Sequence, residues 1–239
     1  MPIRRLLLAL CIALAPSTPF SAAQGQSAPQ PEGLRPLVSS DHAAIAAFIL
    51  LATGLGDEGL RDEFQEQRSG ATNSVARVGN AIGDPVYVIP AIGVSYLVAQ
   101  LTDNHSLSRL AWTAGRTALV ASAVTTALKY TVGRTRPTRD GDSDHFQPFG
   151  GGTSFPSGHT SLAFAMATVV ADETHDGWSD PLVYGAATVT AFARVNDDRH
   201  WVSDVLAGAI VGHLSARWLS RRQGSLMVGP QAVGLSLQF

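Results

Sequence analysis

Six apolar segments, each longer than an ordinary β-strand, most constrain what this chain of 239 residues can fold into. Their length and their content of alanine, leucine and glycine favour helices over strands. Glycine and proline clusters separate them and mark where helices start or stop. We therefore predict an all-α bundle of about six core helices. The segments cover residues 41–55, 84–101, 108–133, 159–173, 180–195 and 201–221.

The first residues have the pattern of a secretory signal peptide, which we place at residues 1–23. Two arginines precede a short apolar run, and small residues at positions 21–23 offer a cleavage site. The run is shorter than the ~20 residues of a bilayer-spanning helix, so an N-terminal membrane anchor is the weaker interpretation. The only cysteine, Cys11, lies in this segment, so no disulfide is expected in the mature chain. We expect export to the periplasm or the outer envelope.

Three further parts follow this leader. Residues 24–40 are rich in Gln, Pro, Ser and Gly and are expected to form a flexible tether. Residues 41–222 hold all six apolar segments and are long enough for one domain with a single core. Residues 223–239 alternate apolar and polar side chains up to Phe239, which predicts an extended tail, packed on the domain or serving as an outer-membrane association signal.

Charge restricts the classes of partner. The formal net charge is −2, so there is no overall basic signal for a nucleic-acid partner. The apolar segments contain ionised side chains such as Arg116, Lys129 and Asp204, a density that favours a soluble bundle or a peripheral membrane protein over a set of membrane spans. An integral inner-membrane protein is the alternative. Neither composition nor pattern indicates an oligomeric state.

The one long irregular stretch, residues 134–158, turns from apolar to polar between predicted helices, so we place a functional site there. Just before and within it, Lys129 and Arg136 are seven residues apart, which would put them on one face of a helix that Pro137 then ends. Two cations so placed can grip one dianion. A basic helix end that complements the helix dipole is the alternative.

A second helix start is predicted at residues 156–160, Pro-Ser-Gly-His-Thr, before an apolar run. Free backbone N–H groups make such a start an anion site, and Gly158 lets the backbone come close to a ligand. Ser157 can donate its hydroxyl, and His159 lies where it can pass a proton to a leaving-group oxygen. An ordinary N-cap with an incidental histidine is the alternative.

Arg194, His200 and Asp204 form a third constellation. His200 and Asp204 are four residues apart, so on a helix they would share a face. The carboxylate can accept a hydrogen bond from one ring nitrogen and leave the other free to attack. A surface His/Asp pair is the alternative. The three constellations together supply what phosphoryl transfer through a phosphohistidine requires: three cations, an anion cradle and two histidines.

Other polar residues of the region are set aside. His145 with Asp142 and Asp144 lies in a polar loop without a second cluster, so we expect a solvated loop and no metal site. Arg134 and Arg139 are surplus cations, and we expect both at the rim of the site.

The motifs resemble those of the type 2 phosphatidic acid phosphatase (PAP2) and vanadium haloperoxidase superfamily, over roughly residues 85–215. The resemblance implies a PAP2-like helical bundle in which His200 takes the phosphoryl group and Asp204 holds its tautomer. His159 would protonate the leaving oxygen and then activate water. The family pattern has a serine where this chain has Ala193, so we expect weaker anion binding. The resemblance assigns phosphate binding to Lys129, Arg136, Ser157, Gly158 and Arg194.

By this resemblance the protein would be a metal-independent phosphatase acting on phosphomonoesters or lipid phosphates. No cofactor is expected, and vanadate would act as an inhibitor. In one alternative the same cradle holds vanadate as the cofactor of a haloperoxidase. In another, Ala193 marks a site that binds phosphate without catalysis, in a structural protein of the envelope.

Overall fold

The structure is a computed structural model that describes residues 54–140, 142–174, 178–222, 228–229 and 232–233. Its main elements are helices. They are α3 (Asp57–Glu66), α4 (Gly70–Gly83), α5 (Pro85–Leu101), α6 (His105–Val132), α7 (Pro137–Asp140), α8 (Gly158–Thr174), α9 (Ser179–Asn196) and α10 (Val202–Arg222).

Parts of the predicted organisation lie outside the described residues. These are the signal peptide (1–23), the tether (24–40) and nearly all of the first apolar segment (41–55). Within the predicted tail, β1 (Val228–Gly229) and β2 (Ala232–Val233) pair in antiparallel fashion, and the other tail residues are not described.

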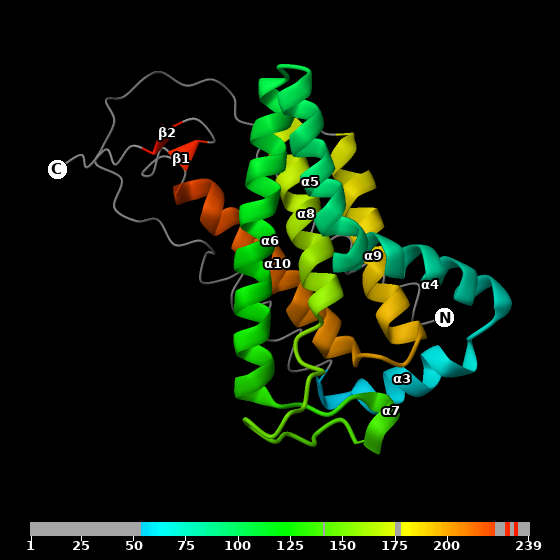
Figure 1. Cartoon of the computed structure of the whole chain (residues 1–239). Coiled ribbons are helices and arrows are strands. Elements are labelled where there is room, and N and C mark those ends of the chain that lie inside the picture. The colour runs from blue at the N-terminus through cyan, green and yellow to red at the C-terminus, as the bar shows by residue number, and fades with distance from the viewer. Residues whose placement is uncertain (1–53, 141, 175–177, 223–227, 230–231, 234–239) are drawn as a thin grey trace, which may run out of the picture.

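The long helices form a bundle with α8 at its centre (Figure 1). α8 packs against α6, α9 and α10, while α4 packs on α9 and α5 on α6. The main apolar core lies between α8, α9 and α10, and Phe64 of α3 joins it. In Figure 1 the C-terminal end of α6 and the N-terminal ends of α8 and α10 lie at the same end of the bundle, beside α3 and α7. The three predicted motifs therefore meet at one end of the fold.

Two glycines bring α10 into backbone contact with the start of α8. A Cβ at Gly208 would lie 2.6 Å from the carbonyl oxygen of Ser157, and one at Gly212 would lie 2.1 Å from that of Ser161. Only glycine leaves room for this approach. The Ser157 amide also donates to the backbone carbonyl of Asp204 at 2.9 Å. The second and third motifs are thus joined through the backbones of two helices.

The helix boundaries near the first motif correct the prediction. α6 ends at Val132, before Arg136, so Lys129 and Arg136 do not share a helical face. The residue after α6 is Gly133, whose φ of +62° lies in the left-handed region that ends helices. Pro137 does not end α6 but begins α7, where the fixed φ of proline suits the first helical position. Arg136 therefore reaches the site from a non-helical stretch.

The pattern of apolar segments predicts neither α3 nor α4. α3 is rich in charged residues, and α4 contains glycine, asparagine, serine and threonine in place of a continuous apolar run. α4 begins with a capping box between Ser69 and Thr72. It lies so close to α9 that a Cβ at Gly79 would be 2.3 Å from the carbonyl oxygen of Val189. Capping and tertiary contact, more than an apolar run, account for this helix.

α5 differs from the other helices because it is apolar on nearly all sides and only Ala99 is buried in it. Asp84 caps its start, and Pro85 takes the first helical position. In the described part of the chain, no helix alone has the length and apolar character to cross a membrane. α4 and α5 taken together, with a bend of 48° between them, meet both requirements.

Candidate active site

Lys129, in the last turn of α6, holds the loop that leads into α8. Its ammonium donates to the backbone carbonyls of Thr153 and Pro156, each at 2.6 Å. Burial, reinforced by the positive charge of Arg136, lowers the pKa of Lys129 to about 8. That value is still above neutral pH, so Lys129 remains a cation at the edge of a cavity.

Arg136 and Arg194 supply two further positive charges. Arg136 precedes α7, and Arg194 lies in the last turn of α9. The Nε atom of each guanidinium is buried and has no hydrogen-bond partner among the described residues. Burial lowers the pKa of both side chains, that of Arg194 to about 10, where the charge of Arg136 adds to the effect. Partly buried cations that repel one another and have buried, unpaired donors would be stabilised by an anion.

Arg194 is oriented by a residue outside the predicted motifs. Its Nη1 donates to Oδ1 of Asn80 at 2.7 Å, and Nδ2 of Asn80 donates to Asp197 at 2.7 Å. At the same contact between α4 and α9, a Cβ on Gly79 would lie 3.0 Å from that of the fully buried Ala193. An amide from α4 therefore holds this arginine, in a chain that lacks the serine of the family pattern beside it.

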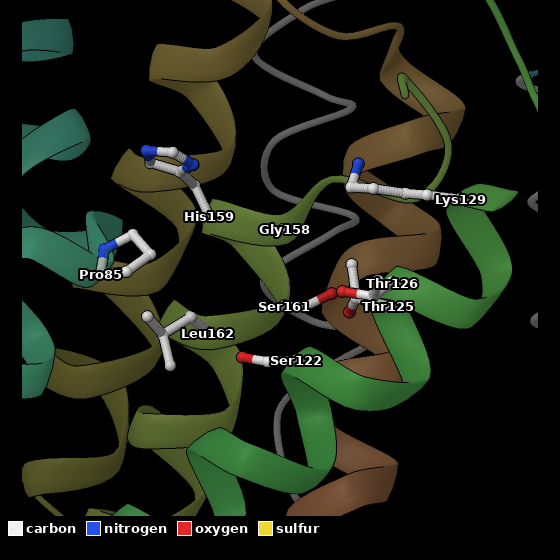
Figure 2. A pocket seen from close by; sticks show the side chains of 9 residues that line it. All are labelled: Pro85, Ser122, Thr125, Thr126, Lys129, Gly158, His159, Ser161 and Leu162. Carbon is white, nitrogen blue, oxygen red and sulfur yellow. The ribbon is translucent and has the colours of Figure 1, made fainter. Parts of the chain in front are cut away.

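The start of α8 borders a cavity of about 150 Å³ between α5, α6 and α8. Figure 2 shows the backbone of Gly158 between the side chains of Lys129 and His159, with Pro85 of α5 on the histidine side. Ser157 is fully buried, and its Oγ accepts a hydrogen bond from Thr160 at 3.0 Å. This hydrogen bond does not use the hydroxyl proton of Ser157, which a ligand could accept.

His159 lies across Gly158 from Lys129 (Figure 2) and is 28% exposed. Its Nε2 is 4.0 Å from Oδ2 of Asp84, the residue that caps α5. Burial, with the positive charge of Arg194 adding to it, lowers the pKa of His159 to about 4. The imidazole is therefore neutral at neutral pH. A bound anion would offset the neighbouring cations and raise this pKa.

His200 lies just before α10, which begins at Val202, so the predicted shared helical face with Asp204 is wrong. The two residues meet through a turn instead. Oδ2 of Asp204 accepts from the Trp201 amide at 3.0 Å and lies 3.6 Å from Nδ1 of His200, a separation slightly longer than a hydrogen bond. Burial lowers the pKa of His200 to about 4, although the carboxylate opposes the shift. The neutral ring thus turns Nδ1 to the carboxylate, which leaves Nε2 available as a nucleophile.

Arg134 is not the rim residue that its position in a polar loop predicts. Its side chain is 3% exposed, and Nη1 donates to Oδ1 of Asp204 at 2.9 Å. Nη2 pairs at 2.9 Å with Asp57 of α3, a fully buried carboxylate that no motif indicates. The side chain of Arg139, the other predicted rim residue, lies outside the described part of the structure.

The predicted site residues come together in one cluster. The charges of Lys129, Arg136 and Arg194 all act on His159, and those of Lys129 and Arg194 act on His200. Such a cluster can bind a tetrahedral oxyanion, present one imidazole to its central atom and another to a leaving oxygen. Across the described ranges, no group of three or more His, Cys, Asp or Glu side chains is placed to hold a metal ion.

The fold is a helical bundle whose candidate site groups three cations with two histidines. Residues 110–226 match the PAP2 superfamily. All three motifs lie inside the matched range. α3, α4 and α5 precede it, so Asp57 and Asn80 come from outside the matched region.

One curated protein and two solved structures are also similar to this chain. The lipid A 1-phosphatase of Porphyromonas gingivalis is 40% identical over 97 residues, which are 38% of this chain and 20% of that protein. The chain thus spans about a fifth of the length of that relative. Two crystal structures share the fold at 17% identity, which confirms the predicted PAP2-like helical architecture. They are LpxE of Aquifex aeolicus (TM-score 0.56; 68% of this chain, 93% of that one) and the transmembrane PAP2-type phosphatidylglycerolphosphate phosphatase of Bacillus subtilis (TM-score 0.55; 79% and 98%).

Proposed function

We propose that the protein is a phosphatase that hydrolyses phosphate esters through a phosphohistidine on His200, without a metal ion. The observation that carries this proposal is the buried, neutral His200 beside a cluster of cations, two of which have unpaired buried donors. Cations that neutralise phosphate oxygens stabilise the charge of the transition state and admit a neutral nucleophile. The name of the P. gingivalis relative, a phosphatase, supports the same activity.

Two steps complete the reaction. Nε2 of His200 attacks phosphorus, so that a P–N bond forms while the P–O bond breaks and His159 donates a proton to the leaving oxygen. Water then attacks phosphorus, His159 accepts its proton, and the P–N bond breaks to restore the imidazole. Asp204 stabilises the positive charge on His200 between the steps. Phosphate oxygens are bound by Lys129, Arg136, Ser157, Gly158 and Arg194.

The purified protein should release orthophosphate in excess EDTA, because every group in the two steps belongs to the chain. A panel of phosphatidate, an isoprenyl diphosphate and a small phosphomonoester tests this, and vanadate should inhibit as an analogue of five-coordinate phosphorus. Orthophosphate binding without turnover of any substrate would contradict the proposal and indicate a binding protein. Halide oxidation with vanadate and peroxide, in place of phosphate release, would indicate a haloperoxidase.

We further propose that the ester is a lipid phosphate, taken from a membrane surface in peripheral contact with α5. Pro85 borders the cavity, and the next apolar side chains, Val86, Tyr87 and Ile89, are 71%, 62% and 49% exposed. An exposed apolar surface that begins at the edge of a site suits acyl chains or the bilayer that holds them. This surface continues along α5 at Val94, Leu97, Val98 and Leu101.

Glutamine at both Val94 and Leu97 should raise KM for a lipid phosphate in vesicles by at least about 10-fold, since burying each apolar side chain is worth roughly 1.5–3 kcal/mol. Turnover of a water-soluble ester should not change, because both residues lie in the second half of α5, away from Pro85. Leu182→Gln on α9 is the matched control, since Leu182 and Leu97 are both 61% exposed. Equal losses on both substrates, or in the control, would contradict membrane contact through α5.

The predicted leader at residues 1–23 leads us to propose that the enzyme acts in the periplasm or at the outer envelope. Its residues lie outside the described part of the structure, so the argument rests on their sequence pattern. Fractionation of cells without detergent should recover the protein from the periplasmic or outer-membrane fraction. Recovery with the inner membrane alone would favour the integral alternative.

A further inference from the structure

A buried chain of charges connects α3 to the carboxylate beside His200. Oδ1 of Asp204 accepts from Nη1 of Arg134 at 2.9 Å, while the other oxygen, Oδ2, faces His200. Nη2 of Arg134 donates in turn to Oδ2 of Asp57 at 2.9 Å. The three charged side chains are almost fully buried, at 0%, 3% and 0% exposure for Asp57, Arg134 and Asp204.

The guanidinium of Arg134 is held on all sides. Nε and Nη2 donate to the backbone carbonyl of Ser143 at 2.9 and 2.5 Å, and Nη1 also donates to Oγ of Ser203 at 2.7 Å. The rings of Phe146 and Trp201 lie with their centroids 5.2 and 5.4 Å from its central carbon. Because this planar guanidinium is fixed, its Nη1–H group can donate to Asp204 from one position only, which fixes the orientation of the Asp204 carboxylate.

Asp57 also fixes the first turn of α10. Its Oδ1 accepts from the backbone amide of Ser203 at 2.9 Å, and its Oδ2 accepts from the Ser203 hydroxyl. A carboxylate at a helix start satisfies an unpaired amide and stabilises the positive end of the dipole. One residue of α3 therefore holds both the turn that contains Asp204 and the arginine that contacts it.

We propose that Asp57 is a positioning residue for phosphoryl transfer, which acts through Arg134 and Ser203 on the Asp204 carboxylate and so selects the attacking tautomer of His200. This inference rests on the proposed function. A role in anchoring α3 alone would not require this buried network of three charges. Burying charges is costly, and an apolar contact would anchor a helix as well. Burial raises the pKa of Asp204, but its contacts, foremost those with His200 and Arg134, outweigh burial and lower that pKa, so the acceptor stays ionised.

Asp57→Asn keeps the shape of the side chain and removes its charge. We expect kcat to fall roughly 10- to 100-fold, the usual effect of removing a residue that orients a directly acting group, with KM nearly unchanged. NMR of protein labelled with ¹⁵N-histidine reads the ring nitrogens of His200, whose signals are assigned by their loss in His200→Ala. The wild type should show one tautomer with the proton on Nδ1, and Asp57→Asn should show a mixture. Ser203→Ala, a smaller change, should shift the tautomer in the same direction if Asp57→Asn does not fold.

Arg61→Gln is the matched control, because Arg61 also anchors α3, through Nε and Nη2 bonds to Asp198 at 2.6 and 2.7 Å. In this control variant, the tautomer of His200 and kcat should be the same as in the wild type. Equal effects of Arg61→Gln and Asp57→Asn would overturn the inference in favour of simple docking of α3, as would a single tautomer and full kcat in Asp57→Asn. A wild type that hydrolyses no phosphate ester, with the tautomer still shifted in Asp57→Asn, would overturn the proposed function and leave the positioning role supported.

Discussion

Replacement of His200 by alanine is expected to lower kcat/KM for phosphate release by at least about 10³-fold, since the variant lacks the group that forms the P–N bond. Binding should survive much better than turnover. Lys129, Arg136 and Arg194 remain in place, so the affinity for orthophosphate should change little. The variant thus separates anion binding, which depends on the cations, from covalent chemistry, which depends on the imidazole.

Trapping the proposed phosphohistidine intermediate provides a second test of the role of His200. Rapid quenching with labelled substrate should yield a phosphoenzyme that is stable in alkali and labile in acid, as a P–N bond is, and His200→Ala should not form it. His105→Ala is the control, because His105 is exposed at the opposite end of α6 from Lys129. A phosphoenzyme retained in His200→Ala, or full turnover by that variant, would identify another nucleophile and contradict the mechanism.

The helices that frame the site are predictable because continuous apolar runs have clear end signals. The predicted segments 84–101, 159–173 and 180–195 differ from α5, α8 and α9 by at most one residue at each end. Where two helix-ending residues lie close together, as they do after Lys129, the sequence does not show which of them ends the helix. Both Gly133 and Pro137 can end a helix, and the glycine ends α6 first because it adopts the left-handed conformation.

The residues that support the site are not predictable from local patterns. Asp57 and Asn80 meet Arg134 and Arg194 across 77 and 114 positions of sequence. Each is a single polar residue without a local partner, and such residues usually lie in solvent. Their roles depend on how α3 and α4 dock, which in turn depends on close glycine contacts and buried ion pairs. The motifs identify the candidate phosphate-binding groups, whereas only the fold shows which residues hold those groups in place.

His159→Gln is expected to separate the two chemical steps. An alkyl phosphate needs a proton on its leaving oxygen, so its turnover should fall roughly 10²–10⁴-fold. A nitrophenyl phosphate has a good leaving group and should still phosphorylate His200. Because the second step lacks its base, the variant should release one equivalent of nitrophenol in a burst and then turn over slowly. Stopped-flow absorbance measures both phases.

The pH dependence of kcat supplies an independent check on His159. In the free protein, burial and the nearby cations hold its pKa at about 4, and a bound phosphate dianion raises it by offsetting those charges. Proton donation in the complex is therefore available below the raised pKa and is lost as the pH rises through it. This alkaline limb should be present for an alkyl phosphate in the wild type and in His145→Gln, but absent in His159→Gln. An unchanged limb and no burst in His159→Gln would mean that another group moves the proton, and Asp84, 4.0 Å from Nε2, would be the next to test.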